Sequence, residues 1–143
     1  MSRWSTVLVG VDGSENSHKA LTWAAAEAAD HGAELVVLNV WEHTLPAPGG
    51  NPSVPESGAA DPGRPTPDDL LNEIKTVLGE EPPVRVRPRL EEGSAAKTLI
   101  DQSQDADLLV VGTRGHGGFR GLVLGSVSQH VAAYANCPVT VVR

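Results

Sequence analysis

Short apolar runs rich in valine and leucine alternate along the chain with segments whose apolar residues recur every three or four positions. Runs of the first kind predict β-strands, and the wider spacing predicts helices. The strand-like runs lie at residues 5–11, 34–41, 83–90, 107–111 and 138–143. The helix-like segments begin near Ser14, Pro67, Ser94 and Ser126. Most of the runs are continuously apolar, which is typical of strands that are covered on both faces.

The strict alternation of strands and helices predicts an α/β fold with a parallel sheet and right-handed crossovers. We expect a single-domain, open, doubly wound sheet of five strands with helices on both faces, because 143 residues suit one domain. Ligands of such sheets bind beyond the carboxyl ends of the strands, where the strand order switches. A site is therefore expected after the strands that end near residues 11, 40 and 111.

Residues 44–67 interrupt this alternation with 7 prolines and 4 glycines in 24 positions. Proline at this density is incompatible with a regular helix or strand. We interpret the segment as a mobile surface loop within the single domain of residues 1–143. The loop is either a tolerated insertion or a docking or lid element.

The strand expected at residues 83–90 carries Arg85, Arg87 and Arg89 on one side and apolar residues on the other. Pro88 has no N–H to give to a strand ladder, which favours an edge strand. The arginine row has no aromatic partners for base stacking. We therefore interpret it as a solvated strand face rather than a nucleic-acid stripe.

The chain has 11 lysines and arginines against 18 aspartates and glutamates, a formal charge of −7. This charge disfavours nucleic acid and anionic membranes as partners, since both are bound mainly through basic residues.

The single cysteine, Cys137, rules out an intramolecular disulfide and a cysteine-rich zinc site, and we expect an inert thiol. Neither a signal peptide nor an apolar stretch of about 18 residues is found, so we expect a cytoplasmic protein.

Residues 112–126 join the fourth strand to the last helix and hold 6 of the 15 glycines. The N–H groups at a helix N-terminus lack partners and attract anions, and glycine lets backbone approach a ligand closely. Arg114 and Arg120 add positive charge, and Ser126 is expected to be the N-cap. The segment predicts a phosphate-binding loop, and the alternative is a flexible linker before a capped helix.

Two familiar phosphate loops do not fit this segment. A Walker A loop requires Gly-Lys-Ser/Thr, and no Gly-Lys pair occurs in the chain. A dinucleotide fingerprint placed on Gly115, Gly117 and Gly121 would need an acidic residue about 20 positions later, after another strand. The last strand contains no acidic residue, so both motifs are excluded.

The remaining pattern, Gly112-x2-Gly115-x9-Gly125-Ser126, resembles the motif of the nucleotide-binding members of the universal stress protein family. Residues 7–14 resemble the first strand and turn of that family, and residues 136–142 resemble its last strand. The resemblance covers nearly the whole chain, with residues 44–67 as the departure. It implies the strand order 3-2-1-4-5 and a homodimer formed through the last strand, Val139–Val142.

The same resemblance implies that the protein binds ATP, with Mg²⁺, and which residues form the site. Asp12 would meet the ribose, although it is also a candidate helix cap, and Val11 and Val40 would line the base. The glycine loop and the residues beside it would hold the phosphates. The implied site residues are Val11, Asp12, Val40, Val111, Gly112, Arg114, Gly115, Gly125, Ser126 and Val127.

Three functional hypotheses follow from these observations. The first is a regulatory ATP-binding module. Its shape, or its binding to an unknown protein partner, would change with the nucleotide that it holds. The second is a weak ATPase or phosphotransfer enzyme, for which His116 and Asp12 are the candidate bases, although an arginine finger and a loop lysine are missing. The third is an interaction protein without a nucleotide.

The homodimer through the last strand also has a physical reason. Residues 139–142 would form an apolar edge strand, and uncovered edges tend to be paired.

Overall fold

A computed structural model describes residues 4–42, 64–113 and 125–143. Its centre is a five-stranded sheet in the order β3-β2-β1-β4-β5, and every neighbouring pair is parallel. The strands are β1 (Thr6–Gly10), β2 (Glu34–Trp41), β3 (Val86–Glu92), β4 (Leu108–Gly112) and β5 (Val139–Val142). The helices are α1 (Glu15–His31), α2 (Pro67–Leu78), α3 (Ala95–Gln102), the short 3₁₀ helix η1 (Ser103–Asp105) and α4 (Ser126–Tyr134). The predicted fold and strand order are confirmed.

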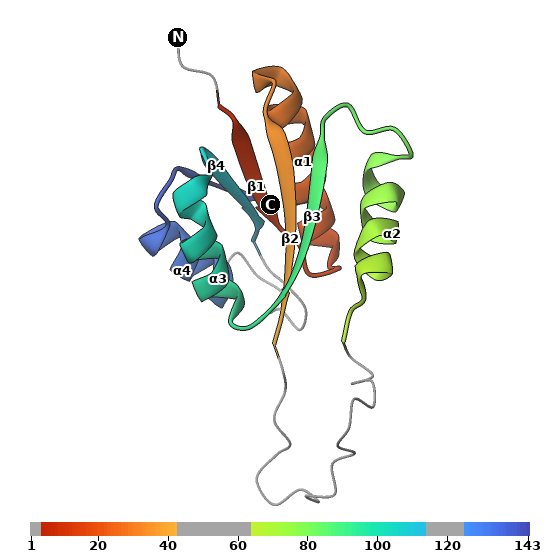
Figure 1. Cartoon of the computed structure of the whole chain (residues 1–143). Coiled ribbons are helices and arrows are strands. Elements are labelled where there is room, and N and C mark those ends of the chain that lie inside the picture. The colour runs from red at the N-terminus through yellow and green to blue at the C-terminus, as the bar shows by residue number, and fades with distance from the viewer. Residues whose placement is uncertain (1–3, 43–63, 114–124) are drawn as a thin grey trace, which may run out of the picture.

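The sheet separates two apolar cores, and helices cover both of its faces (Figure 1). On one face, Val7 and Val9 pack with α1 and α2, and on the other, Leu8 packs with α3 and α4. Successive side chains of a strand point to opposite faces, so a strand between two cores must be apolar at every position. This explains the continuous apolar runs in the sequence.

Three helices begin at a residue whose side chain accepts a hydrogen bond from the backbone N–H three positions later. These capping residues are Ser14, Thr66 and Ser94. Thr66 and Asp69 form a reciprocal capping box, and Pro67 occupies the first helical turn, where proline is tolerated. The predicted proline-rich segment therefore overlaps α2 by one residue, Pro67, and Thr66 before it is the N-cap. The part of it at residues 44–63 lies outside the described residues.

Helix α4 differs from the sequence prediction at both ends. Its N-cap is Gly125, not Ser126, and no side chain caps it. The helical spacing of Val127, Val131 and Tyr134 predicts that all three face inward, but Tyr134 is 66% exposed. The reason lies in the helical spacing, because Tyr134 shares a face with the exposed His130 four residues earlier, 5.9 Å away between ring centroids.

The strand predicted at residues 83–90 is confirmed as an edge strand, although it begins at Val86. The backbone N–H of Leu35 in β2 donates to the carbonyl oxygen of Arg85 at 2.9 Å. Because backbone groups along a strand alternate in direction, Pro88 presents its missing N–H to the open side of the sheet. The proline therefore costs no ladder hydrogen bond.

Candidate functional site

The sequence-predicted site lies where the carboxyl ends of β1 and β4 meet. These two strands are neighbours. The chain passes from β1 to β2 and β3 on one side of β1, and then crosses to β4 on the other side. This is the point at which the strand order switches, and ligands of open parallel sheets bind there. The structure brings Val11 and Asp12, which follow β1, to the same edge as Val111 and Gly112, which end β4.

The valines of the predicted site form its floor. Val11 and Val111 are each 4% exposed, and their side chains belong to opposite cores of the sheet. Val40, at the end of β2, is half-buried against the α3 and α4 core. Of the three, Val40 therefore has the most side-chain surface to offer an apolar ligand.

Asp12 is exposed and shapes the turn between β1 and α1. Its Oδ1 accepts a hydrogen bond from the backbone N–H of Ser14 at 2.9 Å, and its own N–H lies 3.3 Å from the Ser17 hydroxyl. Gly13 takes the positive φ of 84° that this tight turn requires. The N-cap of α1 is Ser14, so Asp12 supports the turn while its carboxylate stays at the surface.

Gly112 has a structural role in addition to any ligand role. A Cβ placed on it would lie 2.8 Å from the backbone oxygen of Asn16 and 2.9 Å from the backbone carbon. The end of β4 therefore passes so close to the start of α1 that a side chain at position 112 would force one of them to shift. This contact fixes the distance between the β1 turn and the beginning of the glycine loop.

The two ends of the glycine loop are joined at Thr113. The backbone N–H of Gly125 donates to the Thr113 carbonyl oxygen at 2.6 Å, and the Thr113 N–H donates to Val142 in β5 at 3.0 Å. The buried hydroxyl of Ser128 lies 3.0 Å from the Thr113 carbonyl oxygen and 3.1 Å from that of Gly125. The Asn16 amide reaches the Thr113 hydroxyl at 3.4 Å. The loop thus leaves and returns at one fixed place.

Sequence reasoning missed Asn16, Thr113 and Ser128, which hold this place together. Thr113 lies inside the glycine motif at an unspecified position, so the motif gives no reason to single it out. Ser128 is a buried polar residue three positions after Gly125, and this spacing is the one available signal. Trp41 was missed as well: it ends β2, and the guanidinium carbon of Arg64 lies 5.0 Å from its ring centroid.

The N-terminus of α4 has no side-chain cap, whereas α1, α2 and α3 each have one. The first N–H groups of a helix have no intrahelical acceptor, and the helix dipole makes this end attractive to anions. Ser126 is exposed, and Val127 packs partly against the α3 and α4 core. Ser126 and Val127 can thus present backbone donors to an anion, whereas the N–H of Gly125 already donates to Thr113. Arg114 and Gly115, also predicted for the site, lie outside the described residues.

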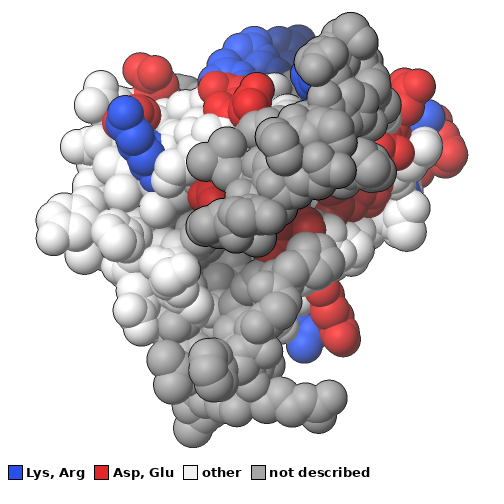
Figure 2. All heavy atoms as spheres, turned by 90° about the horizontal axis from the view of Figure 1, so that it is seen from below, with Lys and Arg blue, Asp and Glu red and all other residues white. Residues whose placement is uncertain are grey.

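Carboxylates surround this end of the sheet. Asp12, Glu42 and Glu92 follow or end β1, β2 and β3, and all three are exposed. Figure 2 looks onto this end and shows acidic side chains on it. Two of these carboxylates have local partners: Asp12 accepts from the Ser14 N–H, and the Glu42 Oε1 lies 3.4 Å from the backbone nitrogen of Ala95 at the start of α3. An anionic ligand here must therefore be compensated by positive charge.

In residues 4–42, 64–113 and 125–143, the His, Cys, Asp and Glu side chains form no group of three or more that could hold a metal ion. Among the described helices, none combines the length and the hydropathy that crossing a membrane requires.

The fold and this edge define an α/β protein with an anion-attracting helix N-terminus at the switch point of its sheet. Residues 3–143 match the sequence profile described as the universal stress protein family. The chain belongs to the universal stress protein family.

Individual relatives agree with this assignment. A universal stress protein of Mycolicibacterium smegmatis is 41% identical over 96% of this chain, which spans 45% of that longer protein. One from Thermus aquaticus is 35% identical, with 98% of this chain and 99% of the relative aligned. A solved universal stress protein in complex with cAMP has a TM-score of 0.65 and 26% identity, covering 99% of this chain and 98% of that one.

Proposed function

We propose that this chain is a regulatory nucleotide-binding module that holds ATP, with Mg²⁺, at the carboxyl edge of the sheet. The observation that carries the proposal is the N-terminus of α4. It lacks a side-chain cap, follows the glycine loop directly and lies at the switch point between β1 and β4. A phosphate group would supply the acceptors that the serine and threonine caps supply to the other helices.

Each part of the edge has a place in this proposal. The backbone donors of Ser126 and Val127 would bind the phosphates, with Gly125 and, from the loop, Gly115 and Arg114 beside them. Val111 and Gly112 would lie next to the ribose and the first phosphate. The exposed Asp12 carboxylate would accept from a ribose hydroxyl, and Val11 and Val40 would face the adenine. Charge-assisted hydrogen bonds of this kind contribute about 1.5–3 kcal/mol each.

The role of Mg²⁺ follows from the charges at this edge. Asp12, Glu42 and Glu92 place three carboxylates around the ends of the strands, and a triphosphate adds several negative charges. Mg²⁺ bound between phosphate oxygens and water removes much of the repulsion and needs few protein ligands. We therefore expect that ATP binds more weakly when EDTA removes the magnesium.

The choice of an adenine nucleotide is supported by the relative solved with cAMP. The choice of ATP within that class rests on the resemblance of the Gly112-x2-Gly115-x9-Gly125-Ser126 spacing to that of nucleotide-binding family members. A calorimetric comparison of ATP, ADP, AMP and cAMP tests both the class of ligand and the choice of ATP. Micromolar affinity corresponds to about −8 kcal/mol, and we expect ATP with Mg²⁺ to bind most tightly of the four.

The decisive variant is the double substitution Gly125→Ala and Ser126→Ala. Gly125 has φ −65° and ψ 162°, which alanine adopts without strain, so the change adds a methyl group at the anion site and removes one hydroxyl. We expect ATP affinity to fall at least tenfold. The control is Ser5→Ala, an exposed serine at the opposite end of the sheet. Unchanged ATP affinity in the double variant would refute the site.

The proposal includes a homodimer formed through β5. The N–H groups of Leu109 and Thr113 donate to the carbonyl oxygens of Pro138 and Val142. Because backbone groups alternate along a strand, the N–H groups of Val139 and Val141 face the open side. All four residues of the strand are half-buried apolar or threonine side chains. Such an edge tends to be paired. A cytoplasmic location and an unidentified regulatory protein partner complete the proposal.

A further inference from the structure

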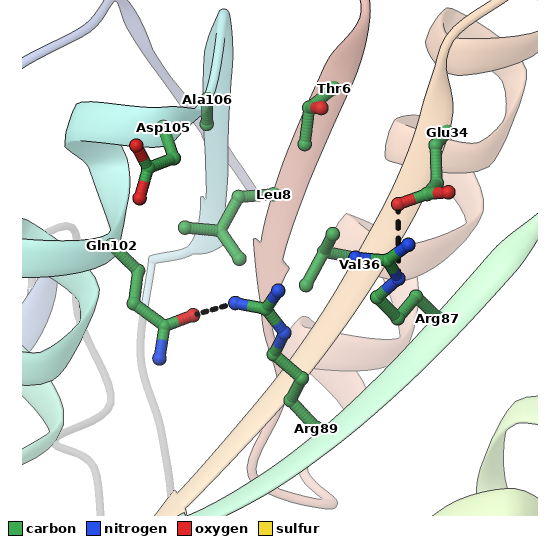
Figure 3. A pocket seen from close by; sticks show the side chains of 9 residues that line it. All are labelled: Thr6, Leu8, Glu34, Val36, Arg87, Arg89, Gln102, Asp105 and Ala106. Carbon is green, nitrogen blue, oxygen red and sulfur yellow. Dashed lines mark hydrogen bonds and ion pairs between the residues drawn. The ribbon is translucent and has the colours of Figure 1, made fainter.

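A cavity of about 290 Å³ lies at the amino end of the sheet, away from the proposed nucleotide site. It opens on the face that α3 and α4 cover, where α3 and η1 leave the starts of β1, β2 and β3 uncovered (Figure 3). Thr6 and Glu34 lie at the rim, at the first residues of β1 and β2. Its volume is near the lower limit for sites of small organic ligands.

One wall of the cavity is positively charged. Arg87 and Arg89 are two positions apart on β3 and therefore share a face of the sheet. The Nε of Arg87 forms an ion pair with Glu34 at 3.2 Å. Arg89 donates from Nη1 to the Oε1 of Gln102 at 3.0 Å, so its partner is an uncharged amide. A guanidinium has five donors, and most of those of Arg89 are left for a ligand.

Gln102 is held in the orientation that this contact needs. Its amide nitrogen donates to the carboxylate of Glu91, which turns the amide oxygen toward Arg89. Glu91 and Arg89 lie on the same face of β3, and Gln102 comes from the last turn of α3. The positive wall is therefore a fixed arrangement of side chains from two elements.

The opposite wall carries a carboxylate. Asp105 ends η1, and Figure 3 shows it across Leu8 from Arg87. Asp105 forms no ion pair with another residue of the described ranges 4–42, 64–113 and 125–143. Leu8 and Val36, 2% and 4% exposed, make an apolar floor between the two walls. Glu34 lies beside Arg87 and offsets its charge, so the charges left across the cavity are those of Arg89 on one wall and Asp105 on the other.

We propose that this cavity binds a small aliphatic zwitterion that carries a carboxylate and an ammonium group. The carboxylate lies against the guanidinium groups of Arg87 and Arg89, which match its two oxygens. The ammonium group faces Asp105, and the alkyl chain between them covers Leu8 and Val36. A molecule with one charge can satisfy only one wall, so the cavity favours the dipolar class. This proposal does not depend on ATP binding.

The test is an NMR titration of the ¹⁵N-labelled chain with three probes, β-alanine, 4-aminobutanoate and 6-aminohexanoate. The singly charged counterparts of the best probe, a fatty acid and an alkylamine of equal length, are titrated beside it. We expect saturable shifts at the amides of Leu8, Arg89 and Asp105, and at least tenfold weaker binding of both counterparts. Saturable binding of the fatty acid equal to that of the zwitterion would overturn the proposed ligand class.

Two variants and two matched controls locate the site. Arg89→Gln and Asp105→Asn each remove one wall charge and should weaken the best probe at least tenfold. Arg85→Gln lies on the same strand side but outside the cavity, and Asp101→Asn lies on the exposed side of α3, so both should bind normally. Absence of saturable shifts with all three probes, or equal losses in variants and controls, would overturn the proposal.

Discussion

Alanine in place of Gly112 tests whether the close approach of β4 to α1 holds the site together. The new Cβ would lie 2.8 Å from the Asn16 backbone oxygen, 0.6 Å short of the 3.4 Å at which ordinary contact begins. Both nearest atoms belong to backbone, so relief requires a shift of the start of α1 or the end of β4. Overpacking of this kind costs about 1–3 kcal/mol. Alanine also lowers the conformational entropy of the unfolded chain, which stabilises the folded state by about 0.4–1 kcal/mol.

The net expectation is a loss of about 1–2 kcal/mol in the free energy of unfolding. With a urea dependence of about 2 kcal/mol per molar, this lowers the midpoint by roughly 0.5–1 M. Gly10→Ala is the matched control, because its Cβ would approach only the terminal methyl groups of Leu99, at 3.1 Å. A rotation of that flexible side chain relieves the contact, and we expect a change near zero.

Urea unfolding followed by the fluorescence of the three tryptophans measures both variants. Equal midpoints for Gly112→Ala and the natural chain would refute the argument from backbone crowding. So would a loss for Gly10→Ala as large as that for Gly112→Ala.

Three other predictions concern the packing, the thiol and the edge strand. Ser103→Ala should lose about 1–3 kcal/mol in urea unfolding, because the fully buried hydroxyl accepts from the Asn136 N–H at 2.8 Å; an unchanged midpoint would contradict this. Burial, and secondly the charge of Asp107, raise the pKa of Cys137 above its ordinary value. Alkylation by iodoacetamide should therefore rise at higher pH than with free cysteine, and a coincident or lower profile would contradict it. Val141→Pro removes an N–H on the open side of β5 and should give a monomer in light scattering, whereas a dimer would place the interface elsewhere.

Much of the fold could be predicted because its causes are local. The runs of β1, β2 and β4 are continuously apolar because these strands are buried between two cores. Ser14, Thr66 and Ser94 precede helices as residues that cap with their own side chains. The strand order came from the family resemblance rather than from the apolar pattern, which does not encode which strands are neighbours.

The interactions that join distant segments could not be predicted in this way. Thr113 contacts Asn16, Gly125 and Val142, residues far apart in sequence that meet only once the sheet has formed. The packing reason for Gly112 is of the same kind, since the atom it avoids belongs to α1. Serine at position 126 suggested a cap from its residue type alone, but the backbone turns one residue earlier, at Gly125.

The central claim is that the N-terminus of α4 holds the phosphates of ATP, and an amide NMR titration with ATP and Mg²⁺ tests it most directly. The backbone amides of Ser126 and Val127 report on the proposed donors. The amides of Ala96 and Lys97, in the first turn of the side-chain-capped α3, are the internal control. We predict saturable shifts at the α4 amides that exceed those at the α3 amides. Unchanged α4 amides, or equal shifts at both helices, would contradict the account.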